Sequence, residues 1–333
     1  PWWVWAPAAG RIARGTDANP VAGPDDTGIS ASPGAGGWIS GPDGRMRWGW
    51  RIVLFVSLLL ASAAIIGPIA AKVAGRPTTD AAWIVRGLAV SLPAALIASW
   101  VMMSIVESRS LAALGLVPAR FVPDTLLGLG IGALLIGSVL ALLAATGSLA
   151  WMTDSAARQG GAAGFARLSL ILGLAAFLEE MLFRGYPFQV LAEAAGPIGA
   201  IGLTSAGFAA AHLPNPGVGA LALTNTALAG ILLGIVYWRT FSIWLVTGLH
   251  LAWNAVMSLA ADLPVSGLEF GAHGFRARVT GPEIWTGGDY GPEGGLALTL
   301  VTLVAIAWSV SSRRLDRAPA VLALHPLPGK RLT

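Results

Sequence analysis

The 333-residue chain contains no cysteine. This absence excludes disulfide bonds, thiolate metal ligands and a cysteine nucleophile. Any metal site would have to use histidine, glutamate, aspartate or asparagine side chains. Charge is also scarce: 11% of the residues are charged and 55% are hydrophobic, whereas about 25% are charged in ordinary globular proteins. This balance indicates that much of the chain lies in a nonpolar environment.

Apolar stretches of roughly 20 residues, the length that crosses a bilayer as a helix, recur along the chain. We therefore predict an all-α, polytopic membrane protein with about eight transmembrane helices. The predicted spans are 52–71, 83–106, 126–145, 167–191, 197–213, 218–238, 242–261 and 295–310.

The two ends of the chain differ in composition from these spans. Residues 1–45 are rich in Gly, Pro, Ala and Asp, show no apolar period and are predicted to be disordered. We expect the native product to begin at Met46, where a basic start leads into an apolar run. That run is too long for the apolar region of a secretory signal, so a membrane helix is favoured. The predicted domains are a disordered segment at 1–45, a membrane domain at 46–312 with its motif core at 168–261, and a short cytoplasmic tail at 313–333.

The basic residues indicate an orientation in the membrane. If the N-terminus is inside, 14 Lys and Arg residues lie on the cytoplasmic side and 7 on the other side. The difference narrows to 11 against 7 if the chain begins at Met46. Cytoplasmic loops are enriched in Lys and Arg, so we expect both termini in the cytoplasm. The basic residues form no patch interleaved with aromatics, which argues against a nucleic-acid partner. The oligomeric state leaves no mark in the sequence.

Charged residues inside apolar runs are the candidates for function, because each costs ~2.5–3.5 kcal/mol at a helix centre. In "EEMLFR", Glu180 and Arg184 are four residues apart and share a helix face, so they can neutralise each other. Glu179 is rotated by about 100° from Glu180 and lacks that partner. Its carboxylate is therefore free to act as a general base. The alternative interpretation is a structural salt bridge with a spare glutamate near the lipid headgroups.

Two further polar pairs lie at helical spacing. Phe208 and His212 in "FAAAH" share a face, and His212 can ligate a metal, orient water or carry a proton. His250 and Asn254 in "HLAWN" also share a face and could stabilise an oxyanion. The alternatives are an interfacial polar group at His212 and an interhelical hydrogen-bonded clamp at His250 and Asn254. Asn225, in "TNT", is interpreted as an interhelical packing residue.

The three motifs, in this order and on separate apolar helices, resemble those of the CPBP family of intramembrane proteases. This family includes the CAAX prenyl protease-like and bacteriocin-processing endopeptidases and is also called the ABI family. The resemblance covers about residues 168–261, with weaker support from "LAALGL" at 111–116. It implies an eight-helix fold with an intramembrane catalytic cavity. It also implies hydrolysis of a peptide bond in a membrane-associated or lipidated polypeptide, so the expected partners are that substrate and the bilayer.

The resemblance also implies roles for individual residues. Glu179 would activate water and His212 would hold that water or a metal. His250 and Asn254 would stabilise the oxyanion, or His250 would be a second metal ligand. Two mechanisms stay open: a zinc or other divalent metal on Glu179, His212 and His250, and a metal-free reaction that depends on the glutamate. The predicted catalytic set, including the supporting ion pair, is Glu179, Glu180, Arg184, His212, His250 and Asn254.

Other classes of membrane protein are less consistent with the sequence. The chain lacks HExxH, G-x-S-G and G-x-G-D, the motifs of other membrane proteases. A proton-coupled transporter would also place Glu, Arg and His inside the membrane, but it would be expected to show inverted repeats and broken helices, and neither is visible. A non-catalytic membrane scaffold would not need an intact motif set. We expect substrate specificity to depend on the cavity walls and on the Gly-rich loop 262–294.

Overall fold

The computed structural model describes residues 37–41, 43–74, 80–152, 161–271, 276–312 and 314–315. Most of the predicted disordered segment 1–45 and most of the predicted tail 313–333 lie outside these residues. The chain divides into two units, Pro1–Arg45 and Met46–Thr333, and every helix described below belongs to the second.

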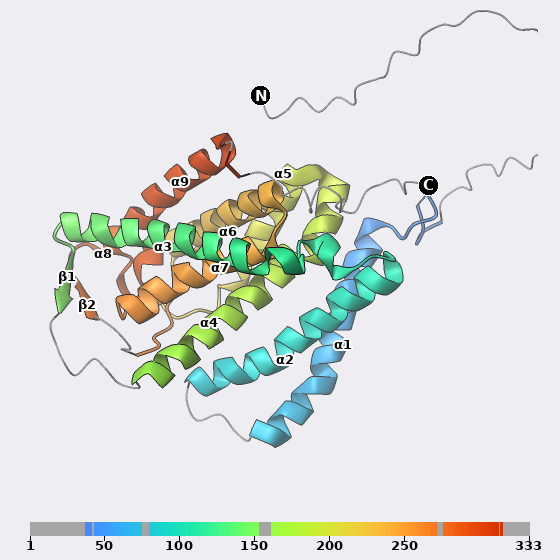
Figure 1. The fold of residues 1–333 in the computed structure, drawn as a ribbon, viewed down its shortest axis with the longest axis horizontal. Helices are drawn as coiled ribbons and strands as arrows, with labels where there is room; N and C mark the ends of the chain where they lie inside the picture. The colour runs from blue at the N-terminus through green and yellow to red at the C-terminus, as the bar shows by residue number, and fades with distance from the viewer. Residues whose placement is uncertain are drawn as a thin grey trace, which may run out of the picture. The chain divides into compact units, whose positions relative to one another are not determined.

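Helices account for most of the described residues, which confirms the predicted all-α class (Figure 1). A short π-helical turn extends the second helix to Val106 and another extends the seventh to Ala260. The helices are α1 (Trp48–Ala74), α2 (Asp80–Val101), α3 (Phe121–Ala145), α4 (Gly161–Phe183), α5 (Tyr186–Ala211), α6 (Ala220–Thr240), α7 (Ile243–Ala255), the short α8 (Glu283–Thr286) and α9 (Leu296–Ser311).

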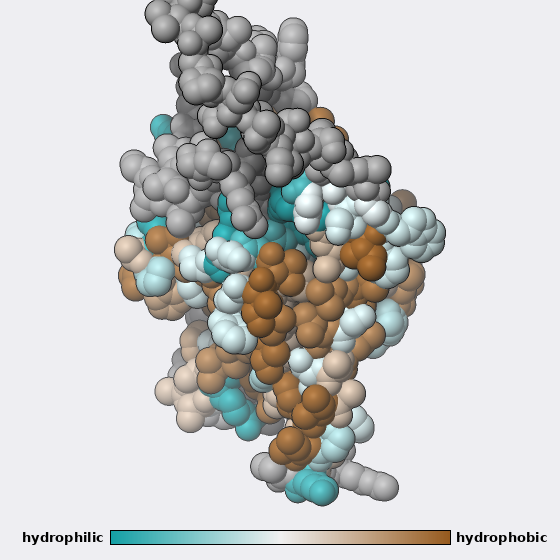
Figure 2. All heavy atoms as spheres, turned by 90° about the vertical axis from the view of Figure 1, so that its right-hand side faces the viewer, coloured by the Kyte–Doolittle hydropathy of each residue, from teal (hydrophilic) through white to brown (hydrophobic). Residues whose placement is uncertain are grey.

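Within the described residues, six stretches are long and apolar enough to cross a membrane. One of them, Gly161–Ala211, contains both α4 and α5, and the apolar helix α9 is shorter than the others. Large apolar side chains point outward along the helices, such as Leu60 and Ile65 of α1, which are 64% and 68% exposed. Figure 2 shows apolar atoms over much of one face. A polytopic membrane protein is therefore confirmed, whereas the exact count of eight spans is not.

The boundary between the fourth and fifth predicted spans was wrong. The prediction carried one helix from 167 to 191, but α4 ends at Phe183 and α5 begins at Tyr186. The turn needs Gly185, because a Cβ there would lie 2.2 Å from the carbonyl oxygen of Met181. Helix α5 also changes direction at Gly196, which has a φ of +71° and adopts it without the steric cost of a side chain.

Helix α7 is the central element and packs against α3, α4 and α6. Its closest neighbour is α3, where Gly128 and Gly132 face the backbone of α7. A Cβ at Gly128 would lie 2.1 Å from the Leu245 carbonyl oxygen, and one at Gly132 would lie 2.2 Å from that of Leu249. Small residues four apart allow two membrane helices to approach this closely. The contact fixes the position of the helix that carries the third motif.

The loop after α7 is fastened to the helices rather than free of them. Its strand β2 (Arg276–Val279) pairs antiparallel with β1 (Leu149–Met152), which follows α3. At the other end of the loop, the Asn225 amide donates to the Gly295 carbonyl oxygen and accepts from the Thr299 hydroxyl. These bonds join α6 to the start of α9, as expected of an interhelical packing residue, and Asn225 also lines the cavity described below.

Candidate functional site

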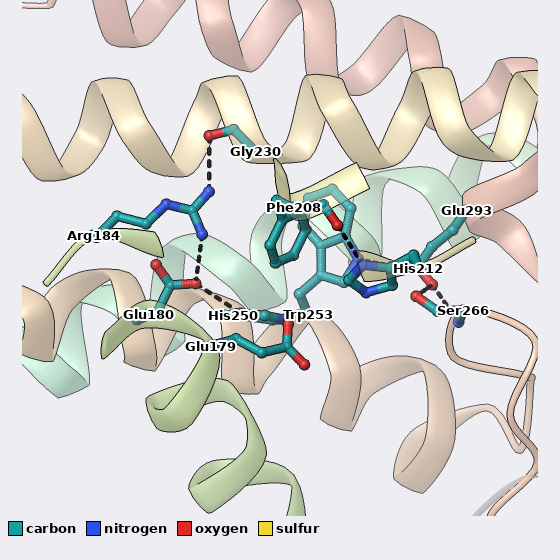
Figure 3. Close-up of polar contacts among 10 residues, drawn as sticks. All are labelled: Glu179, Glu180, Arg184, Phe208, His212, Gly230, His250, Trp253, Ser266 and Glu293. Atoms are coloured by element: carbon teal, nitrogen blue, oxygen red, sulfur yellow. Dashed lines mark hydrogen bonds and ion pairs between the residues drawn. The ribbon is translucent and has the colours of Figure 1, made fainter. Parts of the chain in front are cut away.

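Each of the three motifs contributes residues to the lining of one cavity of about 340 Å³. Glu179 is in the last two turns of α4, His212 is the residue that ends α5, and His250 and Asn254 lie on α7. All four line the cavity. Polar groups that are 33 or more residues apart in the sequence are therefore brought to one place by different helices, as Figure 3 shows for most of them.

A buried network centres on Glu180. Its Oε1 atom accepts from Nη1 of Arg184 at 3.2 Å and lies 2.9 Å from Nδ1 of His250. The Arg184 guanidinium also donates to the Gly230 carbonyl oxygen on α6, at 2.9 Å, and lies 5.0 Å from the centre of the Phe208 ring. Glu180 and Arg184 are fully buried, so each charge depends on the other. The predicted pair between them is confirmed, and the network also orients the His250 imidazole.

Glu179 differs from its neighbour, as its helix position indicates. Its side chain is 32% exposed, and its Oε2 atom lies 3.8 Å from Nε2 of His250. That oxygen is buried and has no hydrogen-bond partner among the described residues. An ionised carboxylate oxygen is an acceptor, so this atom can bind a water or a substrate group that enters the cavity.

The geometry fixes which nitrogen of His212 carries the proton. Its Nδ1 atom lies 2.8 Å from the carbonyl oxygen of Phe208, which can only accept, so Nδ1 donates. In the neutral imidazole Nε2 then keeps its lone pair and can accept a hydrogen bond. The Phe208 ring lies 4.7 Å from the His212 ring and 6.0 Å from the His250 ring, measured between centres. Phe208 therefore packs near both imidazoles and near the guanidinium of the buried ion pair.

The donors around the cavity do not form a ready metal site. No group of three or more His, Asp or Glu side chains within the described ranges is placed to hold a metal ion. His250 directs Nδ1 to Glu180, and His212 directs Nδ1 to a carbonyl oxygen. The set of Glu179, His212 and His250 is therefore not assembled as metal ligands in this arrangement.

The cavity is also lined by Trp253, Ser266 and Glu293, which were not predicted from the sequence. Trp253, within "HLAWN", donates from its indole to Oε1 of Glu293 at 2.8 Å. Glu293 lies in the loop, and its other oxygen accepts from Ser266. No local pattern identifies these contacts, since Glu293 is 40 residues from Trp253. In the same loop, burial raises the pKa of the Tyr290 phenol above its usual value, because its charged form would lose its hydration.

The middle of the chain is similar to a known protein family. Residues 162–256 match a family model described as type II CAAX prenyl endopeptidase Rce1-like. A search of curated proteins finds no match. The matched region contains EExxxR, FxxxH and HxxxN together with the cavity residues of α4, α5, α6 and α7. The match confirms the resemblance drawn from the motifs: in its central region, this integral membrane protein is similar to the Rce1-like, CAAX-type endopeptidases of the CPBP family.

Proposed function

We propose that this protein is an intramembrane endopeptidase that hydrolyses a peptide bond in a membrane-associated or lipidated polypeptide. The observation that carries the proposal is the meeting of Glu179, His212, His250 and Asn254 at one cavity among apolar helices. The family match over the same residues supports this reaction class. Charged and polar groups cost free energy inside a membrane, and those that occur there are usually paired or functional.

In the proposed reaction Glu179 is the general base. Its free oxygen accepts a proton from a water that also donates to, or is oriented by, Nε2 of His212. A positioned general base typically contributes about 10²–10⁴-fold to a rate. The hydroxide equivalent adds to the carbonyl carbon of the scissile peptide, and Glu179 then returns the proton to the leaving nitrogen.

His250 and Asn254 stabilise the negative oxygen of the tetrahedral intermediate in this proposal. Two carboxylates, Glu179 and Glu180, face His250, and one guanidinium balances them. A doubly protonated His250 makes this group of four electrically neutral, which a low-dielectric site favours. It then donates through Nδ1 to Glu180 and through Nε2 into the cavity, where the Asn254 amide adds a second donor.

The test is cleavage by purified protein in liposomes. Glu179→Ala, His212→Ala and His250→Ala should each abolish cleavage of a membrane-anchored peptide while the protein still inserts. Glu283→Ala is the matched control, because this glutamate is exposed on α8 and does not line the cavity. Cleavage that survives Glu179→Ala would refute the proposed mechanism, and proton flux without cleavage would favour a transporter.

Metal dependence is tested in the same assay. Because three donors are not assembled around a common point among the described residues, we expect a chelator to leave the cleavage rate unchanged. We also expect metal analysis to find no stoichiometric zinc. Loss of activity with a chelator and recovery with zinc would instead favour Glu179, His212 and His250 as ligands.

We also propose that both termini lie in the cytoplasm, from the excess of Lys and Arg on that side. Reporter fusions after Ser312 and within the loop 262–294 should report opposite sides of the membrane. The same side for both would contradict this orientation.

A further inference from the structure

The loop between α7 and α9 forms one wall of the cavity although it lies outside the matched residues 162–256. Its contribution is a mixture of apolar side chains, one hydroxyl and one carboxylate. The loop residues that line the cavity are Val265, Ser266, Leu268, Phe270 and Glu293. This wall of the cavity is therefore built from residues beyond the region matched to the family.

Glu293 is held in a fixed position. Its Oε1 atom accepts from the Trp253 indole at 2.8 Å, and its Oε2 atom accepts from both the backbone N–H and the hydroxyl of Ser266. All three donors are neutral, and no basic side chain in the described ranges forms an ion pair with Glu293. An ionised carboxylate offers about four acceptor positions, so one position on Oε1 is still free. Glu293 is therefore a rigid negative charge with one acceptor site to spare.

The loop segment that holds Glu293 also docks beside His212. The Asn215 amide, three residues after His212, donates to the carbonyl oxygen of Ser266 at 2.9 Å. Ser266 has a φ of +48°, a left-handed conformation that costs roughly 1–2 kcal/mol for a residue with a side chain. The bonds from Glu293 and Asn215 hold it there. Figure 3 shows Glu293 and His212 at the end of the group away from Arg184.

One carboxylate at the cavity has no basic side chain to balance it. Among the described residues that line the cavity, Glu179 and Glu293 are acidic and none is Lys or Arg. In the proposed mechanism Glu179 belongs to the neutral group with Glu180, Arg184 and His250, so the negative charge left unbalanced among these lining residues is that of Glu293. In a cavity among apolar helices, a charge acts on a ligand more strongly than it does in water. A cationic group of the substrate would be attracted, and an acidic one would be repelled.

We infer that Glu293 is a specificity-determining residue that binds a Lys or Arg side chain next to the cleaved bond of the substrate. The inference rests on the proposed endopeptidase function, since it names the class of polypeptide that this cavity accepts. The basic side chain donates to the free position on Oε1 of Glu293. The backbone of the substrate then runs past His212 toward Glu179, and the apolar walls take its hydrophobic residues.

The experiment uses the full chain in liposomes of zwitterionic lipid, so that the membrane itself does not attract basic peptides. A library of membrane-anchored, fluorescence-quenched peptides first yields one that is cleaved. Each position near its cleaved bond is then replaced in turn by Lys, Gln or Glu, and kcat/KM is measured for each peptide. At one position we expect the Lys peptide to be cleaved roughly tenfold faster than the Glu peptide, the size of a hydrogen bond to a charged group.

Two variants separate charge from structure. Glu293→Gln should reduce the ratio of the Lys to the Glu peptide to about one, because the charge is lost. Ser266→Ala should retain the ratio, because it removes one donor from the carboxylate but leaves its charge. Equal loss of all peptides in Glu293→Gln would overturn the inference and assign Glu293 a purely structural role.

The ratio of kcat/KM for the Lys and Glu peptides in the wild-type protein tests the inference even if a variant fails to fold. A wild-type protein that cleaves Lys and Glu peptides equally at every position would refute the inference while leaving the protease proposal intact. Cleavage of no peptide, or cleavage that does not depend on Glu179, would refute the proposed function and the inference with it.

Discussion

The contact between α3 and α7 permits a sharp test of how the cavity is positioned. In Gly132→Ala, the new Cβ would lie 2.2 Å from the carbonyl oxygen of Leu249 and 3.0 Å from Cβ of Ala252. Since backbone cannot move aside as a side chain can, α7 would have to shift by about 1 Å to restore ordinary van der Waals contact. Leu249 directly precedes His250, so the shift would displace the imidazole relative to Glu179 and Glu180.

The size of this clash gives an expected change in both the free energy of unfolding and the cleavage rate. Overpacking a tightly packed contact typically costs about 1–3 kcal/mol, which should lower the free energy of unfolding by that amount. A misplacement of about 1 Å at a reacting centre can cost about 100-fold in rate. We therefore expect Gly132→Ala to unfold at a lower temperature in detergent and to cleave a fluorogenic peptide about 100-fold more slowly per folded molecule.

Gly130→Ala is the matched control. Gly130 lies on the same helix, two residues away, and a Cβ there would meet nothing within 4 Å. Its substitution should leave the rate unchanged and leave stability the same or slightly higher, because alanine favours a helix over glycine by about 1 kcal/mol. If Gly132→Ala matches Gly130→Ala in both unfolding temperature and cleavage rate, the close helix contact does not position the site as argued.

The two adjacent glutamates should separate into a structural and a catalytic residue, and the buried tyrosine should affect stability at high pH. Glu180→Gln leaves the Arg184 guanidinium buried without its carboxylate, so the free energy of unfolding should fall by about 3–5 kcal/mol. Glu179→Gln should lose cleavage with little change in unfolding temperature, and equal unfolding temperatures for the two variants would contradict this division. Tyr290 has a raised pKa when folded, so its contribution to stability is complete below its unfolded pKa of about 10 and is lost as the pH rises above that value. Stability measured from pH 9 to 11 should therefore fall more steeply in the wild type than in Tyr290→Phe, and parallel curves would exclude this effect.

Two features of the fold that were not predicted are nevertheless marked by local sequence patterns. The break between α4 and α5 falls at "RGYP", where Gly185 directly precedes α5 and Pro187 lies in its first turn, a known pattern of helix boundaries. The spacing of Gly128 and Gly132 within an apolar run is likewise a helix-packing motif. Residues 161–211 are hydrophobic throughout, and this obscured the break between the two helices. Hydropathy indicates which segments avoid water, but it does not indicate where the backbone changes direction.

The sequence by itself determined the class of fold and the chemistry of the motifs. Its apolar runs require helices, because a backbone in lipid must satisfy its hydrogen bonds within its own segment. The spacing of Glu180 and Arg184 requires a shared face, because a helix repeats every 3.6 residues. These properties depend on residues that are neighbours along the chain, so they can be read without coordinates.

Only the tertiary structure decided which distant groups share the cavity. Glu180 orients His250, which is 70 residues away in the sequence. Glu293 extends from the loop to Trp253 on α7 and adds a carboxylate to the cavity wall. Such contacts depend on the angle and depth at which helices pack, and these are set by the close approach of α3 to α7 and by the bend at Gly196. The Gly-rich composition of the loop did not indicate these contacts, because a residue's partners across the fold leave no period in its own segment.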